Sequence, residues 1–277
     1  VDWQITSQGK LIDDWAVWSG TLPIFDFRFE DDLNDSSPQK FIMHNITSLA
    51  GNFTTGIVGR ALNLTTVLSP ISAASGYIEI WKGNNASEQF TNEKNTTIAF
   101  WIKPETSFFN TSDNGERYLF SDAWQEPGGS ALQLNYYQGD IQFRAGDPYG
   151  TVLNATNLSF GTWYHLAATY NGSHVSLWID GNFSGSSVAT GYEDAYVNPF
   201  AFRLTGNNYT IDEFLLFNDS LSDTDINLIY DYGLAGAHAM DPGGVTVTLD
   251  SPTNATVITN TTAIFNITLE PKLSVEN

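Results

Sequence analysis

The chain has 277 residues, no cysteine and a formal net charge of −20 at pH 7. The missing cysteine excludes disulfide bonds, thiol nucleophiles and cysteine-ligated metal sites. The acidic charge argues against nucleic acid and anionic membranes as partners, because both are bound through basic surfaces. Solubility, adaptation to high salt and calcium binding each fit such a charge. No stretch approaches the ~20 consecutive apolar residues of a transmembrane helix.

The first 23 residues hold Trp3, Trp15 and Trp18 and precede the first clear strand pattern. We expect this N-terminal extension either to pack on the following domain or to pair with strands near the C-terminus.

Residues 97–103 form a clear strand pattern, in which Ile98, Phe100 and Ile102 alternate with Ala99, Trp101 and Lys103. Pro104 ends this strand because proline cannot donate to a sheet ladder. We predict further strands at residues 24–29, 60–65, 76–81, 117–121, 131–136, 140–144, 200–204 and 211–217.

Residues 163–180 contain two apolar runs that flank Asn171-Gly172. This pair predicts a β-hairpin with a type I′ turn, which needs positive φ at both central residues. Asp180-Gly181 gives a second turn signal at the far end of the hairpin.

The segment 221–232 is the one good helix pattern, with Ser222 and Asp225 in capping-box register. We expect Gly233 to end the helix with a positive φ. Many short strands with one small helix predict an all-β fold, an antiparallel two-sheet sandwich.

Small residues, Pro and Gly at 234–244 predict a linker, and strand patterns resume at 245–249 and 263–269. The expected domains are an extension at 1–23, a sandwich at 24–236, a linker at 237–244 and a β segment at 245–277. A lone hairpin is marginal in water, so this segment must be covered by another partner. It is either a donor strand for a neighbouring subunit or the start of a truncated domain.

Acceptor tripeptides for N-linked glycans occur sixteen times, about four times more often than composition alone would give. They predict a heavily glycosylated extracellular or cell-surface protein, and with no cysteine an archaeal source is favoured. The acceptors are Asn34, Asn45, Asn52, Asn63, Asn85, Asn95, Asn110, Asn154, Asn157, Asn171, Asn182, Asn208, Asn218, Asn254, Asn260 and Asn266.

Five stretches, in order, resemble the laminin-G-like, concanavalin A-like jelly-roll family of prokaryotic surface proteins. They are FDFRFEDDLNDSS at 25–37, GRALNL at 59–64 leading to GYIEI at 76–80, TIAFWIKP at 97–104, WYHLAATYNGSHVSLWIDG at 163–181, and IDEFLLFNDSLSDTDINLIYDYG at 211–233. The resemblance implies a jelly-roll sandwich, and residues 245–270 resemble the start of an immunoglobulin-like domain. It also implies a structural Ca²⁺ where the first and last strands meet, with Glu30, Asp35 and Asp212 as ligands. Without calcium, we expect Asp212 to be a solvent-facing strand residue.

Catalysis is not expected. Glycosidases similar to this family carry Glu-x-Asp-x-x-Glu on one strand, and no such spacing occurs. Trp124, with Tyr136 and Tyr137, is the best candidate platform for stacking a sugar. Trp101, Trp163 and Trp178 are expected to pack in the fold instead.

We favour a non-catalytic structural and adhesive glycoprotein, a subunit of a filament or surface layer that binds copies of itself or other surface proteins through β-strand contacts. The alternative is a calcium-assisted carbohydrate-binding module. An unrecognised glycosidase ranks third.

Overall fold

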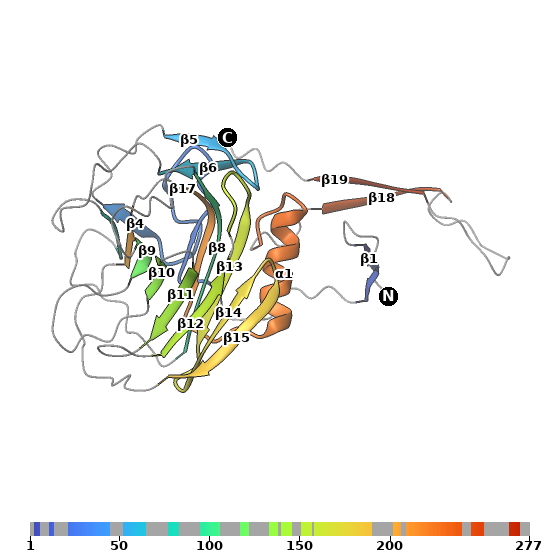
Figure 1. Cartoon of the computed structure of the whole chain (residues 1–277). Coiled ribbons are helices and arrows are strands. Elements are labelled where there is room, and N and C mark those ends of the chain that lie inside the picture. The colour runs from blue at the N-terminus through green and yellow to red at the C-terminus, as the bar shows by residue number, and fades with distance from the viewer. Residues whose placement is uncertain are drawn as a thin grey trace.

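The computed structural model of the chain contains an antiparallel β-sandwich with one helix against it (Figure 1). It describes residues 3–5, 11–13, 22–44, 52–64, 77–82, 95–105, 117–121, 133–137, 140–145, 151–156, 158–189, 202–205, 209–239, 245–251 and 266–271. No helix within these ranges is long and apolar enough to cross a membrane.

The first sheet of the sandwich, which we call the inner sheet, has eight strands and lies next to the helix. Its order is β15 (Asn182–Val188), β14 (His174–Ile179), β13 (Tyr164–Tyr170), β8 (Thr96–Pro104), β17 (Tyr209–Phe217), β6 (Arg60–Asn63) and β5 (Phe53–Thr55), and β3 (Phe25–Phe27) also pairs with β17.

The second sheet, which we call the outer sheet, has seven strands. Its order is β12 (Thr151–Thr156), β11 (Asp140–Ala145), β10 (Gln133–Tyr137), β9 (Arg117–Ser121), β16 (Phe202–Thr205), β7 (Tyr77–Lys82) and β4 (Phe41–His44). Every pairing in both sheets is antiparallel, so the predicted fold class is confirmed.

Two small sheets stand outside the sandwich. β1 (Trp3–Ile5) pairs with β2 (Leu11–Asp13), and β18 (Val245–Ser251) pairs with β19 (Asn266–Pro271). None of these four strands pairs with a described strand of the sandwich. The domain boundaries expected from the sequence stay predictions.

The main core lies between the two sheets. Ile98, Phe100 and Ile102 of β8 face this core, as their alternation predicts, together with Phe214 and Phe143 from the two sheets. Phenylalanine rings dominate the core near β3, where the centroids of Phe25 and Phe214 lie 4.9 Å apart. Burying this much aromatic surface stabilises the sandwich mainly through the hydrophobic effect.

A second apolar cluster lies on the other face of the inner sheet, under α1 (Asp223–Leu234). Ile226 and Ile229 of the helix pack with Trp178 and Leu215 of the sheet. Because the inner sheet is covered on both faces, β17 is buried at every position. The predicted packing of Trp178 is confirmed.

The helix begins as predicted and ends differently. The Ser222 hydroxyl accepts a hydrogen bond from the Asp225 backbone N–H, and the Ser222 backbone N–H donates to the Asp225 carboxylate, which forms the capping box. Gly233 lies inside the helix and packs on Trp101, so the prediction that it ends the helix is wrong. The positive φ after the helix belongs to Gly236, at 71°.

The predicted hairpin of β13 and β14 forms, but its turn type is wrong. Gly172 has a positive φ of 84°, whereas Asn171 is not among the described residues with positive φ. Instead, Asn171 Oδ1 accepts hydrogen bonds from the backbone N–H groups of Ser173 and His174. The two-residue turn with positive φ at both positions is Asp180-Gly181, between β14 and β15.

Candidate functional site

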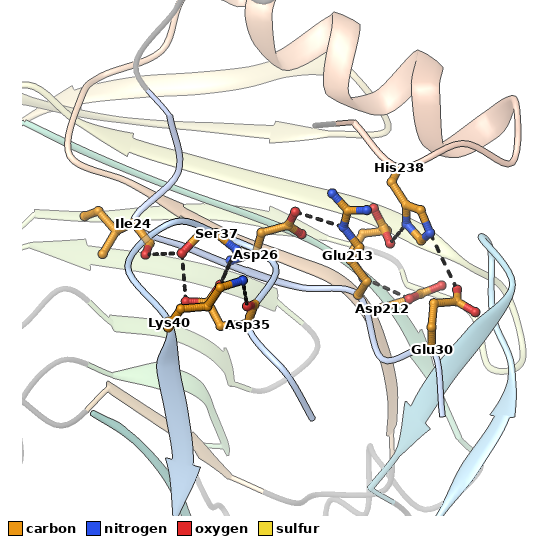
Figure 2. A network of polar contacts seen from close by, with 10 residues as sticks. Ile24, Asp26, Glu30, Asp35, Ser37, Lys40, Asp212, Glu213 and His238 are labelled. Atoms are coloured by element: carbon orange, nitrogen blue, oxygen red, sulfur yellow. Dashed lines mark hydrogen bonds and ion pairs between the residues drawn. The ribbon is translucent and has the colours of Figure 1, made fainter. Parts of the chain in front are cut away.

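The first and last strands of the sandwich meet where β3 pairs with β17, and a network of polar side chains surrounds this junction (Figure 2). The Asp35 carboxylate accepts four hydrogen bonds. They come from the backbone N–H groups of Asp26, Ser37 and Phe41, at 2.7–2.8 Å, and from the Ser37 hydroxyl at 2.7 Å. Lys40 Nζ donates to the backbone carbonyl of Asp35. Asp35 therefore fixes the loop from β3 to β4.

Asp26 is the buried acid beside this loop, with 2% of its surface exposed. Burial raises the pKa of Asp26, and the Arg28 guanidinium, whose Nε lies 2.9 Å from Asp26 Oδ2, lowers it. Removing one partner of a buried, hydrogen-bonded Asp–Arg pair is strongly destabilising, because it leaves the other charge buried without a partner.

Asp212 lies at a bulge of β17 and is fully buried. Its Oδ2 accepts the backbone N–H groups of Ile57 at 2.9 Å and Val58 at 3.2 Å, and its Oδ1 accepts that of Glu213. Burial and the neighbouring Glu213 carboxylate raise the pKa of Asp212 to about 9, against the lowering effect of the three N–H donors. Asp212 therefore holds the tip of the β5–β6 hairpin, where a side chain at Gly56 would clash.

Glu213 has a φ of 50°, which is uncommon for a residue with a side chain. Only 4% of its surface is exposed, and its Oε1 lies 2.6 Å from His238 Nδ1. His238 Nε2 lies 3.9 Å from Glu30 Oε1, and Glu30 accepts the backbone N–H of Arg60. These contacts join β17, the β5–β6 hairpin and the segment after α1.

His238 falls in the stretch that the sequence predicts as a linker. In the structure, His238 bonds to Glu213 and Ala239 is buried. Residues 237–239 therefore pack on the sandwich. No sequence signal pointed to His238, because its partner lies 25 residues away on a strand.

The structure does not assemble the predicted calcium site from Glu30, Asp35 and Asp212. Asp35 accepts four hydrogen bonds and Asp212 accepts three from backbone N–H groups, so both carboxyl groups already have partners within the fold. Across the part of the chain that the structure describes, no group of three His, Cys, Asp or Glu residues could hold a metal ion. The expectation of a solvent-facing Asp212 is also wrong, since it is fully buried. Calcium bound by other residues stays a prediction.

Asp212 and Glu213 are adjacent carboxyl groups, which raises the question of whether they could serve as a glycosidase pair. Both carboxyl groups are buried, and they bind different partners, backbone N–H groups for Asp212 and His238 for Glu213. A glycosidase needs two carboxyl groups that both reach the substrate. This pair does not meet that requirement, and the absence of catalysis stays a prediction.

The outer face of the outer sheet offers a different kind of site. The registers align one residue from every strand in a single row. In strand order, the row is Val152, Arg144, Gln133, Ser121, Arg203, Glu79 and His44. We call these seven residues the polar row.

Along the strands, residues of the polar row alternate with residues of the main core. The neighbours of the row along the strands, such as Phe143, Leu134 and Met43, are buried in that core. Ile42, two residues before His44 on β4, is 38% exposed, whereas Asn135 and Gln142, two residues from Gln133 and Arg144 on β10 and β11, are buried.

A laminin-G-like family model, described as the concanavalin A-like lectin/glucanases superfamily, matches residues 73–227, which is more than half of the chain. The chain belongs to this family. A search of curated protein sequences finds no match for this concanavalin A-like chain.

Solved structures similar to this concanavalin A-like chain include clostridial binding domains. The botulinum neurotoxin serotype D binding domain is 19% identical, with a TM-score of 0.58. The binding domain of Paraclostridial mosquitocidal protein 1 is 19% identical, with a TM-score of 0.56. A serotype D ligand-binding domain in complex with N-acetylneuraminic acid is 18% identical, with a TM-score of 0.57. Each covers 76% of this chain, which in turn spans 50–52% of those chains, and identities this low show the fold alone.

The sugar platform predicted from the sequence falls only partly within the described residues of the concanavalin A-like chain. Trp124 lies outside them. Tyr136 and Tyr137 are consecutive residues of β10, so they belong to opposite faces of the sheet. Tyr136 pairs with the core residue Ile141, and Tyr137 pairs with Asp140. The side chains of both tyrosines lie outside the described residues, so the sugar platform stays a prediction.

Two other tryptophan predictions have different outcomes. Trp101 is buried and stacks on Tyr230 of α1 at a centroid distance of 5.4 Å, as expected for a packing residue. Trp163 lies just before β13 and is only half-buried, and Lys103 Nζ lies 5.3 Å from its ring centroid. Trp163 therefore lies outside the strand, while its half-buried ring keeps one packing contact, with Lys103.

Seven predicted glycan acceptors have side chains that the structure describes. Four are exposed and three are half-buried, so none of the seven is sealed in the core. The exposed ones are Asn34, Asn95, Asn171 and Asn182, and the half-buried ones are Asn52, Asn63 and Asn218. Glycosylation itself stays a prediction.

Proposed function

We propose that the chain is a non-catalytic glycan-binding module of an extracellular glycoprotein. Membership in a family described by its lectins and glucanases supports a carbohydrate ligand. A solved structure of similar fold was determined in complex with N-acetylneuraminic acid, which also favours glycan binding over a purely structural role. The dense glycan acceptors support an extracellular location, and an archaeal source accounts for their combination with the lack of cysteine.

The polar row carries this proposal. It brings two arginines, one glutamate, one glutamine and one histidine into line across the outer sheet. Sugar hydroxyl groups both donate and accept hydrogen bonds, so a face with charged and amide groups of both kinds suits them. Trp81 pairs with the exposed Ile42, two residues from Glu79 and His44 along β7 and β4.

Glycan-array binding tests the proposal, using the full chain produced in a host that adds no N-glycans. We expect specific binding to a subset of glycans, weakened at least tenfold by Arg203→Ala or Gln133→Ala. Arg60→Ala is the matched control, because Arg60 is an arginine of the β5–β6 hairpin, which is not part of the outer sheet. The proposal is refuted if no glycan binds, or if Arg203→Ala and Gln133→Ala both leave the glycan affinity unchanged.

A second candidate is assembly into a filament or surface layer through β-strand contacts. It rests on the β18–β19 hairpin, which pairs with no described strand of the sandwich. The edge strand β15 could accept a strand from a second copy, because its residues are exposed or half-buried and none of them is charged or proline. Electron microscopy of native material tests this candidate, and dispersed monomers would count against it.

A further inference from the structure

Two glycan acceptors of the sequence, Asn52 and Asn63, lie directly opposite each other in the β5–β6 hairpin. Phe53 of β5 pairs with Leu62 of β6, so the next pair away from the hairpin tip is Asn52 with Asn63. The Asn63 N–H donates to the Asn52 backbone carbonyl at 2.8 Å, which extends the ladder to this pair. Opposite residues of an antiparallel ladder have Cβ atoms ~5 Å apart and lie on the same face. The two acceptor side chains therefore share one small area of the surface.

Both asparagines lie on the face of the hairpin that points away from the main core. Leu62 and Leu64, on either side of Asn63, are buried in that core, and Phe53 beside Asn52 packs against it. Successive residues of a strand belong to opposite faces of the sheet, so Asn52 and Asn63 belong to the other face. Both are half-buried, so solvent reaches them only from a limited side.

The nitrogen atom that accepts a glycan on Asn52 lies against Asn63. Asn52 Nδ2 donates a hydrogen bond to the Asn63 backbone carbonyl at 2.7 Å. N-linked glycosylation attaches a bulky sugar to this same nitrogen. A sugar on Asn52, with the hydrogen bond kept, therefore lies beside Asn63. A sugar on Asn63 takes the space next to the Asn52 amide in the same way.

Neither asparagine can turn aside freely to make room for a second sugar. On its other side Asn63 pairs with Thr210 of β17, which is fully buried, so other atoms already cover the space there. Asn52 precedes β5, the edge strand of the inner sheet. Its side chain can turn outward only by breaking the bond from Nδ2 to the Asn63 carbonyl, which opens the end of the ladder.

We propose that Asn52 and Asn63 form one shared glycosylation site, which carries a single N-linked glycan on the folded chain. The exclusion holds whether the sugar is transferred before or after folding. On a folded hairpin, the first glycan blocks access to the second asparagine. A chain that receives both glycans before folding cannot close the ladder at this pair. The inference rests on the proposed extracellular glycoprotein and adds a rule for which of its acceptors are filled together.

Mass spectrometry of glycopeptides from folded native material tests the shared site. Cleavage after glutamate releases residues 31–79 as one peptide, which contains both asparagines. Fragmentation that keeps the sugars attached shows which asparagines of that peptide are filled. We expect peptides with both filled to be about tenfold rarer than the product of the two separate occupancies, the factor that a penalty of about 1.4 kcal/mol gives.

Two variants each remove one acceptor tripeptide and leave both asparagines in place. Thr65→Ala ends acceptance at Asn63, and Thr54→Ala ends acceptance at Asn52. In a host that glycosylates the full chain, each variant should raise the occupancy of the remaining asparagine toward the summed occupancy of the pair. Ser173→Ala, which removes an acceptor tripeptide of the β13–β14 hairpin, is the matched control and should leave the occupancy of both asparagines unchanged.

The outcomes separate this inference from the proposed function. Suppose that other acceptors such as Asn171 carry glycans, and that Asn52 and Asn63 are filled together as often as their separate occupancies predict. The shared site is then refuted while the extracellular glycoprotein stands. The same holds if both asparagines are always empty, or if Thr65→Ala leaves the occupancy of Asn52 unchanged. If no acceptor of the chain is filled, the glycoprotein itself fails and the shared site fails with it.

Discussion

The buried histidine of β13 gives the sharpest prediction. His165 is completely buried, and its ring lies 5.3 Å from that of Trp101 and 5.8 Å from that of Tyr230, by centroids. Neither ring nitrogen has a hydrogen-bond partner within the part of the chain that the structure describes. Burial lowers the pKa of His165 from 6.5 to about 3.

The sign of the effect on stability follows from the two pKa values. In the unfolded chain the histidine takes up a proton as the pH falls below 6.5, whereas the folded chain takes none until about pH 3. The unfolded state therefore binds more protons in this window, and the folded state loses stability as the pH falls. Between pH 7.5 and pH 5 the loss is about 2 kcal/mol, since 1.5 pH units lie below 6.5 and each is worth about 1.4 kcal/mol.

The assay is urea unfolding followed by tryptophan fluorescence at pH 7.5 and pH 5, on the chain and on His165→Phe. Other groups also titrate between these values, so the difference between the two proteins isolates His165. We expect His165→Phe to gain about 2 kcal/mol relative to the chain when the pH falls from 7.5 to 5. His174→Phe, an exposed histidine on the same hairpin, serves as the control and should leave the acid-induced loss in place. A difference between chain and His165→Phe that does not change with pH would refute the reasoning, and His165→Leu repeats the test with a smaller side chain.

Four further predictions concern stability and glycosylation. Gly56→Ala should destabilise the chain by about 1–3 kcal/mol in urea, because the new Cβ would lie 2.6 Å from the Val58 carbonyl oxygen; an unchanged unfolding midpoint would contradict this. Ser222→Ala should cost about 1 kcal/mol and speed hydrogen exchange at the start of α1, while Ser222→Thr should restore most of it. The raised pKa of Asp212, about 9, means that the folded state holds a proton that the unfolded state releases above about pH 4, so this residue destabilises the fold increasingly as the pH rises. Asp212→Asn should therefore gain stability relative to the chain between pH 5 and pH 8, and a constant difference would count against a protonated Asp212. Mass spectrometry of native material should find Asn171 glycosylated, since it is exposed at the tip of a hairpin, and a bare Asn171 would oppose the extracellular proposal.

Sequence patterns located most of the strands because alternation of apolar residues reflects burial on one face. The predicted strand at 117–121 matches β9, and the pattern at 97–103 lies within β8. β15 was missed, because its sequence NFSGSSV has few apolar residues. Its pairing with β14 decides its conformation, which illustrates how sheet neighbours override intrinsic preference.

The candidate sites were harder to predict because their parts come from distant segments. Asp212 was expected at the surface or on calcium, but it binds the backbone of Ile57, 155 residues away. His238 was expected in a linker and instead meets Glu213. A sequence shows which residues can ionise, and it does not show which N–H groups the fold will place against them.

The sequence by itself determined the fold class, the faces of the long strands and the cap of the helix. These depend on residues that are close together along the chain, such as the alternating Ile98, Phe100 and Ile102 or the capping pair Ser222 and Asp225. Only the tertiary structure decided the polar row and the hydrogen bonds that Asp212 accepts from Ile57 and Val58. Each needs a register between strands that are far apart in sequence, and that register is set by the packing of the whole sandwich.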